Sequence, residues 1–169
     1  MFVRRGGAAA VAVAIAGFSP AVGAAVRLAL FPFELVNTSL ESTRSDEAAR
    51  LAAIAEVARQ RFAAAGFEVI DTAPVEQEVA AVSSLRGCNG CELPLARQLG
   101  AAFAAVGWVQ KVSNLILNVN LQIRDVASGR LVQSGSVDIR GNTDESWQRG
   151  TLYLLERRIL PPGPDSPPR

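Results

Sequence analysis

The chain has 169 residues, with 17 basic and 16 acidic side chains, so its formal net charge is +1. A balance this close to zero argues against nucleic acid or an anionic membrane as an electrostatically attracted partner. Apolar residues make up 49% of the chain and charged residues 20%, which is typical of a folded domain with a core. Histidine is absent, which excludes Ser-His-Asp and Cys-His catalysis and every metal site that needs an imidazole. We therefore expect a protein that is not an enzyme and that uses no metal or cofactor.

Residues 1–24 have the pattern of a cleavable export signal. Arg4 and Arg5 give a basic start, residues 6–18 form an apolar run, and Val22-Gly23-Ala24 fits the small-residue rule for signal peptidase. The apolar run is well short of the ~20 residues that span a bilayer, and no cysteine lies nearby to carry a lipid. We expect export to the periplasm, cleavage after Ala24 and no membrane span in the mature protein.

The rest of the chain alternates apolar runs with amphipathic segments, which predicts strands and helices in turn. The first half predicts a strand at 27–33, a polar link at 33–44, a helix at 46–65, a strand at 67–71 and a helix at 75–85. The second half predicts a tight loop at 87–91, a helix at 92–99, a strand at 102–112, hairpin strands at 115–126 and 131–140, and a helix ending near 160. This order predicts one α/β domain over residues 25–160. Its mixed five-stranded sheet ends in an antiparallel hairpin and is packed by three to four helices. Residues 161–169 are proline-rich and predict a disordered tail.

The two longest predicted helices have clear amino-terminal signals. In the first of them, Ser45 is the expected N-cap, and the helix dipole favours Asp46 and Glu47 in the first turn. Its expected buried stripe consists of Leu51, Ile54, Ala58 and Phe62. In the last helix, Asn142 or Thr143 is the expected cap. The acids that follow are interpreted as helix-start residues, because nothing signals a catalytic carboxylate pair.

Cys88-Asn89-Gly90-Cys91 is the one motif with reactive chemistry. In an oxidising periplasm, a structural disulfide that pins the loop to the following helix is the simplest interpretation. A thiol-redox role is the alternative, because a thiolate near a helix amino terminus has a lowered pKa. Two thiolates could also hold Cu(I). Covalent haem would need a histidine where Glu92 stands.

Polar side chains alternate with apolar ones along the predicted hairpin. Side chains two apart share a face of a sheet, so one face is polar and the other apolar. A solvated face is the ordinary interpretation of such alternation. Asparagine, however, is a poor strand former, and Asn118 and Asn120 both lie mid-strand, which favours a hydrogen-bonding recognition surface. The candidate binding face consists of Trp108, Gln110, Asn118, Asn120, Gln122, Arg124, Asp138 and Arg140.

Two patterns in the second half resemble a recurrent module of bacterial envelope proteins. The first is a strand with the pattern Leu-Gly-Ala-x-x-x-Val-x-Gly, matched by Leu99, Gly100, Ala101 and Gly107, with Ala105 at the Val position. The second is a hairpin turn with the pattern Asp-x-x-(Ser/Thr)-Gly, matched by Asp125, Ser128 and Gly129. These residues are similar to the amino-terminal domain of the Tol–Pal translocation protein, the curli secretion-channel lipoprotein and the lipoprotein activators of penicillin-binding proteins. GWVQKVSNLILN and DIRGNTDESW further resemble a narrower secreted bacterial family of unknown function.

The resemblance implies a non-catalytic binding or accessory protein of the bacterial envelope. Its expected partner is another envelope or periplasmic protein. The alternative is a thiol-redox or copper-handling accessory that uses Cys88 and Cys91. Such a protein would serve a periplasmic quinoprotein dehydrogenase system, with which some members of the narrower family are associated.

Overall fold

The structure is a computed structural model that describes residues 25–160. The expected signal at 1–24 and the expected tail at 161–169 lie outside the described residues. Six strands form one sheet: β1 (Val26–Leu30), β2 (Glu34–Asn37), β3 (Phe67–Ile70), β4 (Phe103–Lys111), β5 (Ile116–Asp125) and β6 (Leu131–Arg140). Four α-helices pack on it: α1 (Glu47–Ala64), α2 (Glu76–Ala81), α3 (Glu92–Gln98) and α4 (Asp144–Leu154). The expected α/β class with a mixed sheet and a C-terminal hairpin is confirmed.

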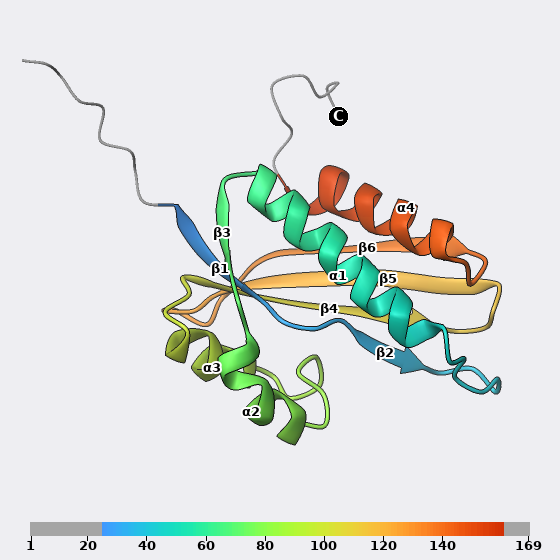
Figure 1. Ribbon diagram of the computed structural model, residues 1–169, viewed down its shortest axis with the longest axis horizontal. Coiled ribbons are helices and arrows are strands. Elements are labelled where there is room, and N and C mark those ends of the chain that lie inside the picture. Colours follow the sequence, from blue (N-terminus) through green and yellow to red (C-terminus); the bar gives the residue numbers. More distant parts are fainter. Residues whose placement is uncertain (1–24, 161–169) are drawn as a thin grey trace, which may run out of the picture.

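The sheet order is β3-β1-β4-β5-β6, with β2 pairing β4 beyond the end of β1. β1 runs parallel to both β3 and β4, whereas β4, β5 and β6 form an antiparallel meander. The helices α1 and α4 lie side by side over one face of this sheet (Figure 1). The shorter helices α2 and α3 lie on the opposite side, at the end where β1 meets β4 (Figure 1).

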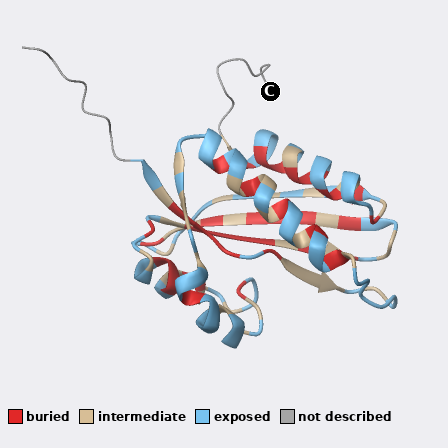
Figure 2. Cartoon of the chain, viewed as in Figure 1, coloured by how far each residue is buried: buried red, intermediate tan, exposed pale blue. Residues whose placement is uncertain are grey.

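Two hydrophobic clusters correspond to these two helix layers. The larger cluster lies under α1 and α4 and includes Ile54, Phe62, Trp147 and alternate residues of β5. The smaller one packs α3 and the turn before α2 against Ala104 and Val106 of β4. Figure 2 shows the buried residues on the sheet and on the inward sides of the helices. Among the described residues, α3 reaches only the Arg124 end of β5 on the second face, and no helix covers β6, the rest of β5 or the end of β4 there (Figure 1). No helix of the described residues is long and apolar enough to cross a membrane.

The sixth strand lies in the segment expected to be a polar link. Residues Glu34–Asn37 pair in parallel with Trp108–Lys111. Leu30 pairs with Ala105 and Glu34 pairs with Trp108, so β1 and β2 together carry one residue more than β4 opposite them. Pro32 lies in this interruption, where its missing N–H costs no ladder hydrogen bond. The sequence did not predict β2, because its first and last residues are polar and its four residues show no alternation. It forms a strand because it pairs with β4.

Helix boundaries also differ from the expectation in two places. The helix expected at 75–85 ends at Ala81, because Val82 is extended, and a short 3-10 turn at Ala73–Val75 precedes it. Ser45 does not cap α1, whose N-cap residue is Asp46 and makes no side-chain cap hydrogen bond. For α4, one of the two expected caps is confirmed, since Thr143 accepts a hydrogen bond from the Ser146 N–H at 3.3 Å. A π-helical turn at Leu155–Ile159 continues that helix.

Gly107 is required by close packing and not by its backbone angles. The aromatic ring of Phe33 lies against its Cα, and a Cβ atom there would overlap the ring. Phe33 belongs to the interruption between β1 and β2, so the missing side chain of Gly107 lets this segment close onto β4.

We expect Gly107→Ala to lower the free energy of unfolding by ~1–3 kcal/mol, because Phe33 must leave its position. Urea denaturation followed by circular dichroism measures the change. Gly87→Ala is the matched control, since a Cβ at Gly87 would meet Ser84 at ordinary contact distances of 3.4–3.9 Å. Equal stability of the two variants would contradict this packing argument.

Candidate functional site

The strand register brings the eight candidate residues onto one face of the sheet. Trp108 lies opposite Asn120, and Gln110 lies opposite Asn118. Asn118 in turn lies opposite Asp138 on β6, and directly opposed side chains point to the same side. The remaining members occupy alternate positions of β5 and β6: Gln122, Arg124 and Arg140. We call this set the polar face.

Side-chain hydrogen bonds, two of them across to β6 and one within β5, hold the asparagines of the polar face in place. Asn118 Nδ2 donates to Asp138 Oδ1 at 2.7 Å, and Ser136 Oγ donates to Asn118 Oδ1 at 2.9 Å. Asn120 is only 8% exposed, and its Nδ2 donates to the Asn118 carbonyl at 3.2 Å. The poor strand propensity of asparagine is therefore offset by specific side-chain bonds, and the polar face has a fixed arrangement.

The loop at 82–91 docks against one end of the polar face. Glu34 shares that face because it pairs with Trp108, and its carboxylate accepts hydrogen bonds from the Leu85 N–H at 2.5 Å and the Ser84 hydroxyl at 2.7 Å. The Arg86 guanidinium lies 5.6 Å from the ring centroid of Trp108, within cation–π range. Trp108 is consequently half-buried by the loop and does not belong to either hydrophobic cluster.

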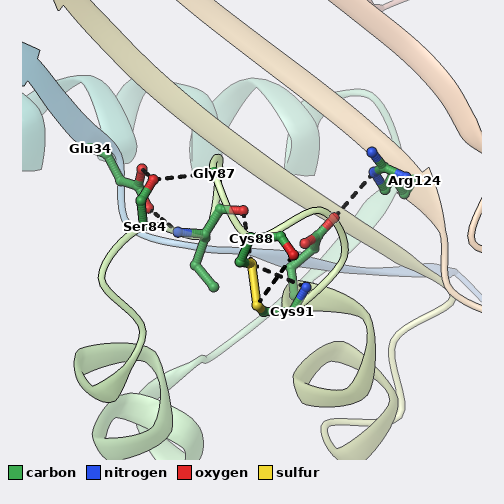
Figure 3. Close-up of a disulfide and its surroundings, with 8 residues drawn as sticks. Glu34, Ser84, Gly87, Cys88, Cys91 and Arg124 are labelled. Carbon is green, nitrogen blue, oxygen red and sulfur yellow. Dashed lines mark hydrogen bonds and ion pairs between the residues drawn. A yellow bond between two sulfur atoms is a disulfide. The ribbon is translucent and has the colours of Figure 1, made fainter.

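Cys88 and Cys91 lie in this loop with their sulfur atoms at disulfide-bonding distance (Figure 3). Their Cα atoms are 5.7 Å apart, and both residues are half-buried. Glu92 begins α3 immediately afterwards, so the pair ties the loop to that helix as expected. Within residues 25–160, no group of three or more His, Cys, Asp or Glu side chains is placed to hold a metal ion. A copper site on the described residues would have the two thiolates alone.

Arg124 is engaged inside the protein and is not a free member of the polar face. Its Nε lies 3.2 Å from Oε1 of Glu92, and its Nη1 donates to the Gly129 carbonyl at 3.2 Å. Glu92 is almost fully buried, so Arg124 neutralises a charge that would otherwise be isolated (Figure 3). The role of Arg124 that the structure shows is to fix α3 against the hairpin.

A second polar cluster, which sequence reasoning did not find, is buried where α1 begins. Lys111 and Glu47 are both 0% exposed, and Lys111 Nζ lies 2.8 Å from Glu47 Oε1. Lys111 also donates to the Ser42 carbonyl at 3.1 Å, while Glu47 Oε2 accepts the Arg44 N–H at 2.8 Å. Burial on its own raises the pKa of Glu47, but the hydrogen bonds from Lys111, Arg44 and Asn142 outweigh it and hold that pKa below its ordinary value.

Asn142 connects this ion pair to α4. Its Nδ2 donates to Glu47 Oε1 at 2.6 Å, and its Oδ1 accepts from the Trp147 indole at 2.9 Å and from Arg50 at 3.2 Å. Arg50 in turn pairs with Asp144 at 2.6 Å and with Asp46 at 2.7 Å. Asn142 is one of the two residues expected to cap α4; Thr143 is the cap, and the Asn142 side chain instead bonds α1 and α4 to each other. One sequence signal pointed here: Lys111 is the single lysine of the chain, and it lies in a strand whose other residues, apart from Gln110, are apolar.

We expect Glu47→Gln to lower the free energy of unfolding by ~3–5 kcal/mol at pH 7, because it leaves Lys111 buried without its counter-ion. Urea denaturation measures this loss. In the double variant Glu47→Gln/Lys111→Met no buried charge is left unpaired, so we expect it to be more stable than Glu47→Gln alone. A double variant no more stable than the single one would contradict the pairing.

The same pair makes stability depend on pH. The folded-state pKa of Glu47 is depressed, so its contribution is fully present above the ordinary value of 4.5 and is lost as the pH falls through the folded-state value. Asp46 behaves likewise, because hydrogen bonds from Arg44 and Arg50 lower its pKa to about 2. We expect the unfolding free energy of the wild type to fall between pH 5 and pH 2, and to fall less steeply in Glu47→Gln. Parallel pH profiles would contradict the assignment.

For the cysteines, we expect Cys88→Ser/Cys91→Ser to remain folded and to lose less than ~2 kcal/mol, because a loop this short gains little from closure. Denaturation of the variant and of the wild type gives the difference. Wild type treated with dithiothreitol is the control and should match the variant. Two thiols that alkylate freely in freshly isolated protein would contradict the structural disulfide.

The structure so far defines an α/β domain with one face of its sheet covered by α1 and α4, and the other covered by α2 and α3 at one end and polar over the rest. The chain belongs to the family DUF3280, described as "Protein of unknown function (DUF2380)", which matches residues 26–159. This match confirms the expected membership of a family of unknown function. A search of curated protein sequences found no match.

Solved structures share the fold at low sequence identity. The C-terminal domain of LpoB from Salmonella enterica is 18% identical with a TM-score of 0.51, covering 72% of this chain and 87% of that one. Lipoprotein GNA1162 from Neisseria meningitidis is 15% identical with a TM-score of 0.51, covering 70% and 83%. The PelC dodecamer from Paraburkholderia phytofirmans is 14% identical with a TM-score of 0.52, covering 83% and 94%. The chain is similar to these proteins in fold.

Proposed function

We propose that this protein is a non-catalytic accessory protein of the bacterial envelope that binds another envelope or periplasmic protein through the polar face. The observation that carries the proposal is the set of hydrogen bonds that fixes Asn118 to Asp138 and Ser136 on a sheet face without a helix over it. A face that only meets solvent needs no such fixed arrangement. Side chains held in place before binding lose little entropy when a partner docks.

The composition of the polar face suits protein recognition. Trp108 and Arg86 stack at one end of it, and tryptophan and arginine are enriched among the residues that dominate binding energy at interfaces. At the other end, Asp138 and Arg140 are exposed and opposite in charge. Because the charges balance, we infer that a partner is selected by hydrogen bonding and shape more than by net charge.

The envelope location rests on two observations. The first is the export-signal pattern of residues 1–24. The second is the shared fold with the lipoprotein GNA1162 from Neisseria meningitidis. The finer likeness to the Tol–Pal amino-terminal domain and the curli channel lipoprotein rests on the sequence motifs and remains part of this proposal.

We expect Asn118→Thr/Asn120→Thr to fold and to lose partner capture. Threonine is the better strand former, which offsets part of the ~1 kcal/mol lost with each side-chain hydrogen bond. Circular dichroism reports folding, and affinity capture from a periplasmic and envelope extract, read by mass spectrometry, reports the partners. Val119→Asp on the covered face is the opposite control and should unfold the domain, because it buries a charge.

A photo-crosslinking amino acid locates the contact directly. At Gln122, on the polar face, it should link to the captured partner. At Gln60, exposed on α1, it should not. An Asn118→Thr/Asn120→Thr variant that captures every wild-type partner, together with equal crosslinking from the two glutamines, would reject the polar face as the recognition surface.

A further inference from the structure

Strand β6 forms an edge of the sheet. β5 pairs with it on one side, and no described strand pairs with it on the other (Figure 1). It is ten residues long, and α4 runs alongside it on the covered face. Long, open edges are places where another chain can add a strand, and proteins commonly protect them.

The register identifies which backbone groups of β6 are open. Gly141 donates its N–H to the Leu115 carbonyl at 2.8 Å, which makes these two residues a hydrogen-bonded pair. Hydrogen-bonded and non-bonded pairs alternate along an antiparallel ladder. The backbone N–H and C=O groups of Ile139, Val137 and Gly135 therefore also point to β5. The residues between them direct their N–H and C=O groups to the open edge: Ser134, Ser136, Asp138 and Arg140.

A groove accompanies this edge on the α4 side. Its volume is about 400 Å³, and its lining includes Asp138, Arg140, Arg149, Gly150 and Tyr153. Tyr153 is 50% exposed although it is a large aromatic residue. Arg149 pairs only with the highly exposed Glu145, at 3.2 Å, and such a pair is weakly bound. The groove therefore has a mixed lining, in which two arginines and one acid, Asp138, lie around the aromatic ring of Tyr153.

The spacing along α4 matches the spacing along a strand. Arg149 and Tyr153 are one four-residue step apart on α4, a rise of ~6 Å along an α-helix, and Arg157 follows four residues later in the π-helical turn. On one face of a strand, consecutive side chains are ~6.8 Å apart. An added strand would thus place three same-face side chains, at positions i, i+2 and i+4, beside these three residues. Arg157 is exposed in the π-helical turn that continues α4.

We propose that the edge of β6 and its groove bind an extended segment of a partner protein that pairs as an added strand. The segment carries acidic side chains at positions i and i+4, which meet Arg149 and Arg157, and an apolar side chain at i+2, which meets Tyr153. Charge complementarity selects the acidic residues, and the open backbone groups of β6 supply the pairing.

A second copy of this chain does not fit the same groove. None of its 16 acidic residues has another acid four positions further on. Pairing of two β6 edges about a two-fold axis would also place the α4 helices of both copies on the same face of the joined sheet. Their arginines would then lie near each other and repel. The occupant is therefore a different protein. This surface adjoins the one in the proposed function, but it binds through the backbone groups of β6 and the side chains of α4 and not through the asparagines of the polar face.

The probe is the acetylated, amidated peptide Ser-Glu-Val-Leu-Thr-Glu-Ser, titrated into the mature protein. We expect saturable binding with a dissociation constant below about 1 mM, and at least ~10-fold weaker binding of the analogue with lysine in place of both glutamates. Wild-type amide exchange is the first readout: the N–H groups of Ser136 and Asp138 should become protected when the peptide binds. Binding that leaves both amides unprotected, binding of the two peptides with equal affinity, or no saturable binding of the glutamate peptide overturns the proposal.

Two variants of one residue test strand pairing. Ser136→Pro removes an open N–H without breaking the β5–β6 ladder, whereas Ser136→Ala keeps the N–H and loses the same hydroxyl. We expect Ser136→Ala to bind like wild type and Ser136→Pro to bind at least ~10-fold more weakly. Equal binding by the two variants, when both are folded, overturns the proposal. If Ser136→Pro does not fold, the amide exchange of the wild type decides the test instead. Asn118→Thr/Asn120→Thr should still bind the peptide, so failure here and failure of the proposed function are distinguishable.

Discussion

The buried ion pair between Glu47 and Lys111 is the constraint on which the arrangement of the helices depends. Two charges with no solvent exposure are costly unless every charged atom is hydrogen-bonded. Lys111 Nζ bonds Glu47 and the Ser42 carbonyl, and Glu47 bonds the Arg44 N–H and Asn142, so the condition is met. These bonds fix the starts of α1 and α4 against the end of β4. Such a pair contributes little net stability, but it makes any other placement of the two helices costly, since that would separate the charges.

With both long helices held on one face, the opposite face of the hairpin is left for polar side chains. The alternation along β5 follows this division: Leu117, Val119 and Leu121 are buried beneath the helices, while Asn118 bonds across to β6. At the other end of the same face, α3 and the loop at 82–91 are held down by Glu34 and by the Glu92–Arg124 pair. Glu34 and Arg124 thus act as structural anchors on a face whose exposed polar residues, such as Asp138 and Arg140, are available for contact.

Sequence patterns predicted the hairpin and its two faces because the period of a strand is two and one face is buried. They missed β2, whose four residues have no periodic signal and form a strand only because β4 lies beside them. They missed the buried network for another reason. Glu47 and Asn142 each had a sufficient local explanation, as a dipole-matched acid and as a cap. Their actual role depends on contact with Lys111, which is distant in the sequence. No local sequence pattern indicates that contact.

The polar face and the open edge are physically continuous, since alternate residues of β6 serve both. Ser134, Ser136 and Asp138 place their side chains on the polar face and their N–H and C=O groups at the edge. A strand added there would extend the polar face by one row, and its outward side chains would lie beside Asp138 and Arg140. Its other side chains would lie against Tyr153 and Arg149. A partner that supplies such a strand from a folded domain would therefore bring that domain against the polar face, so binding at one surface favours binding at the other.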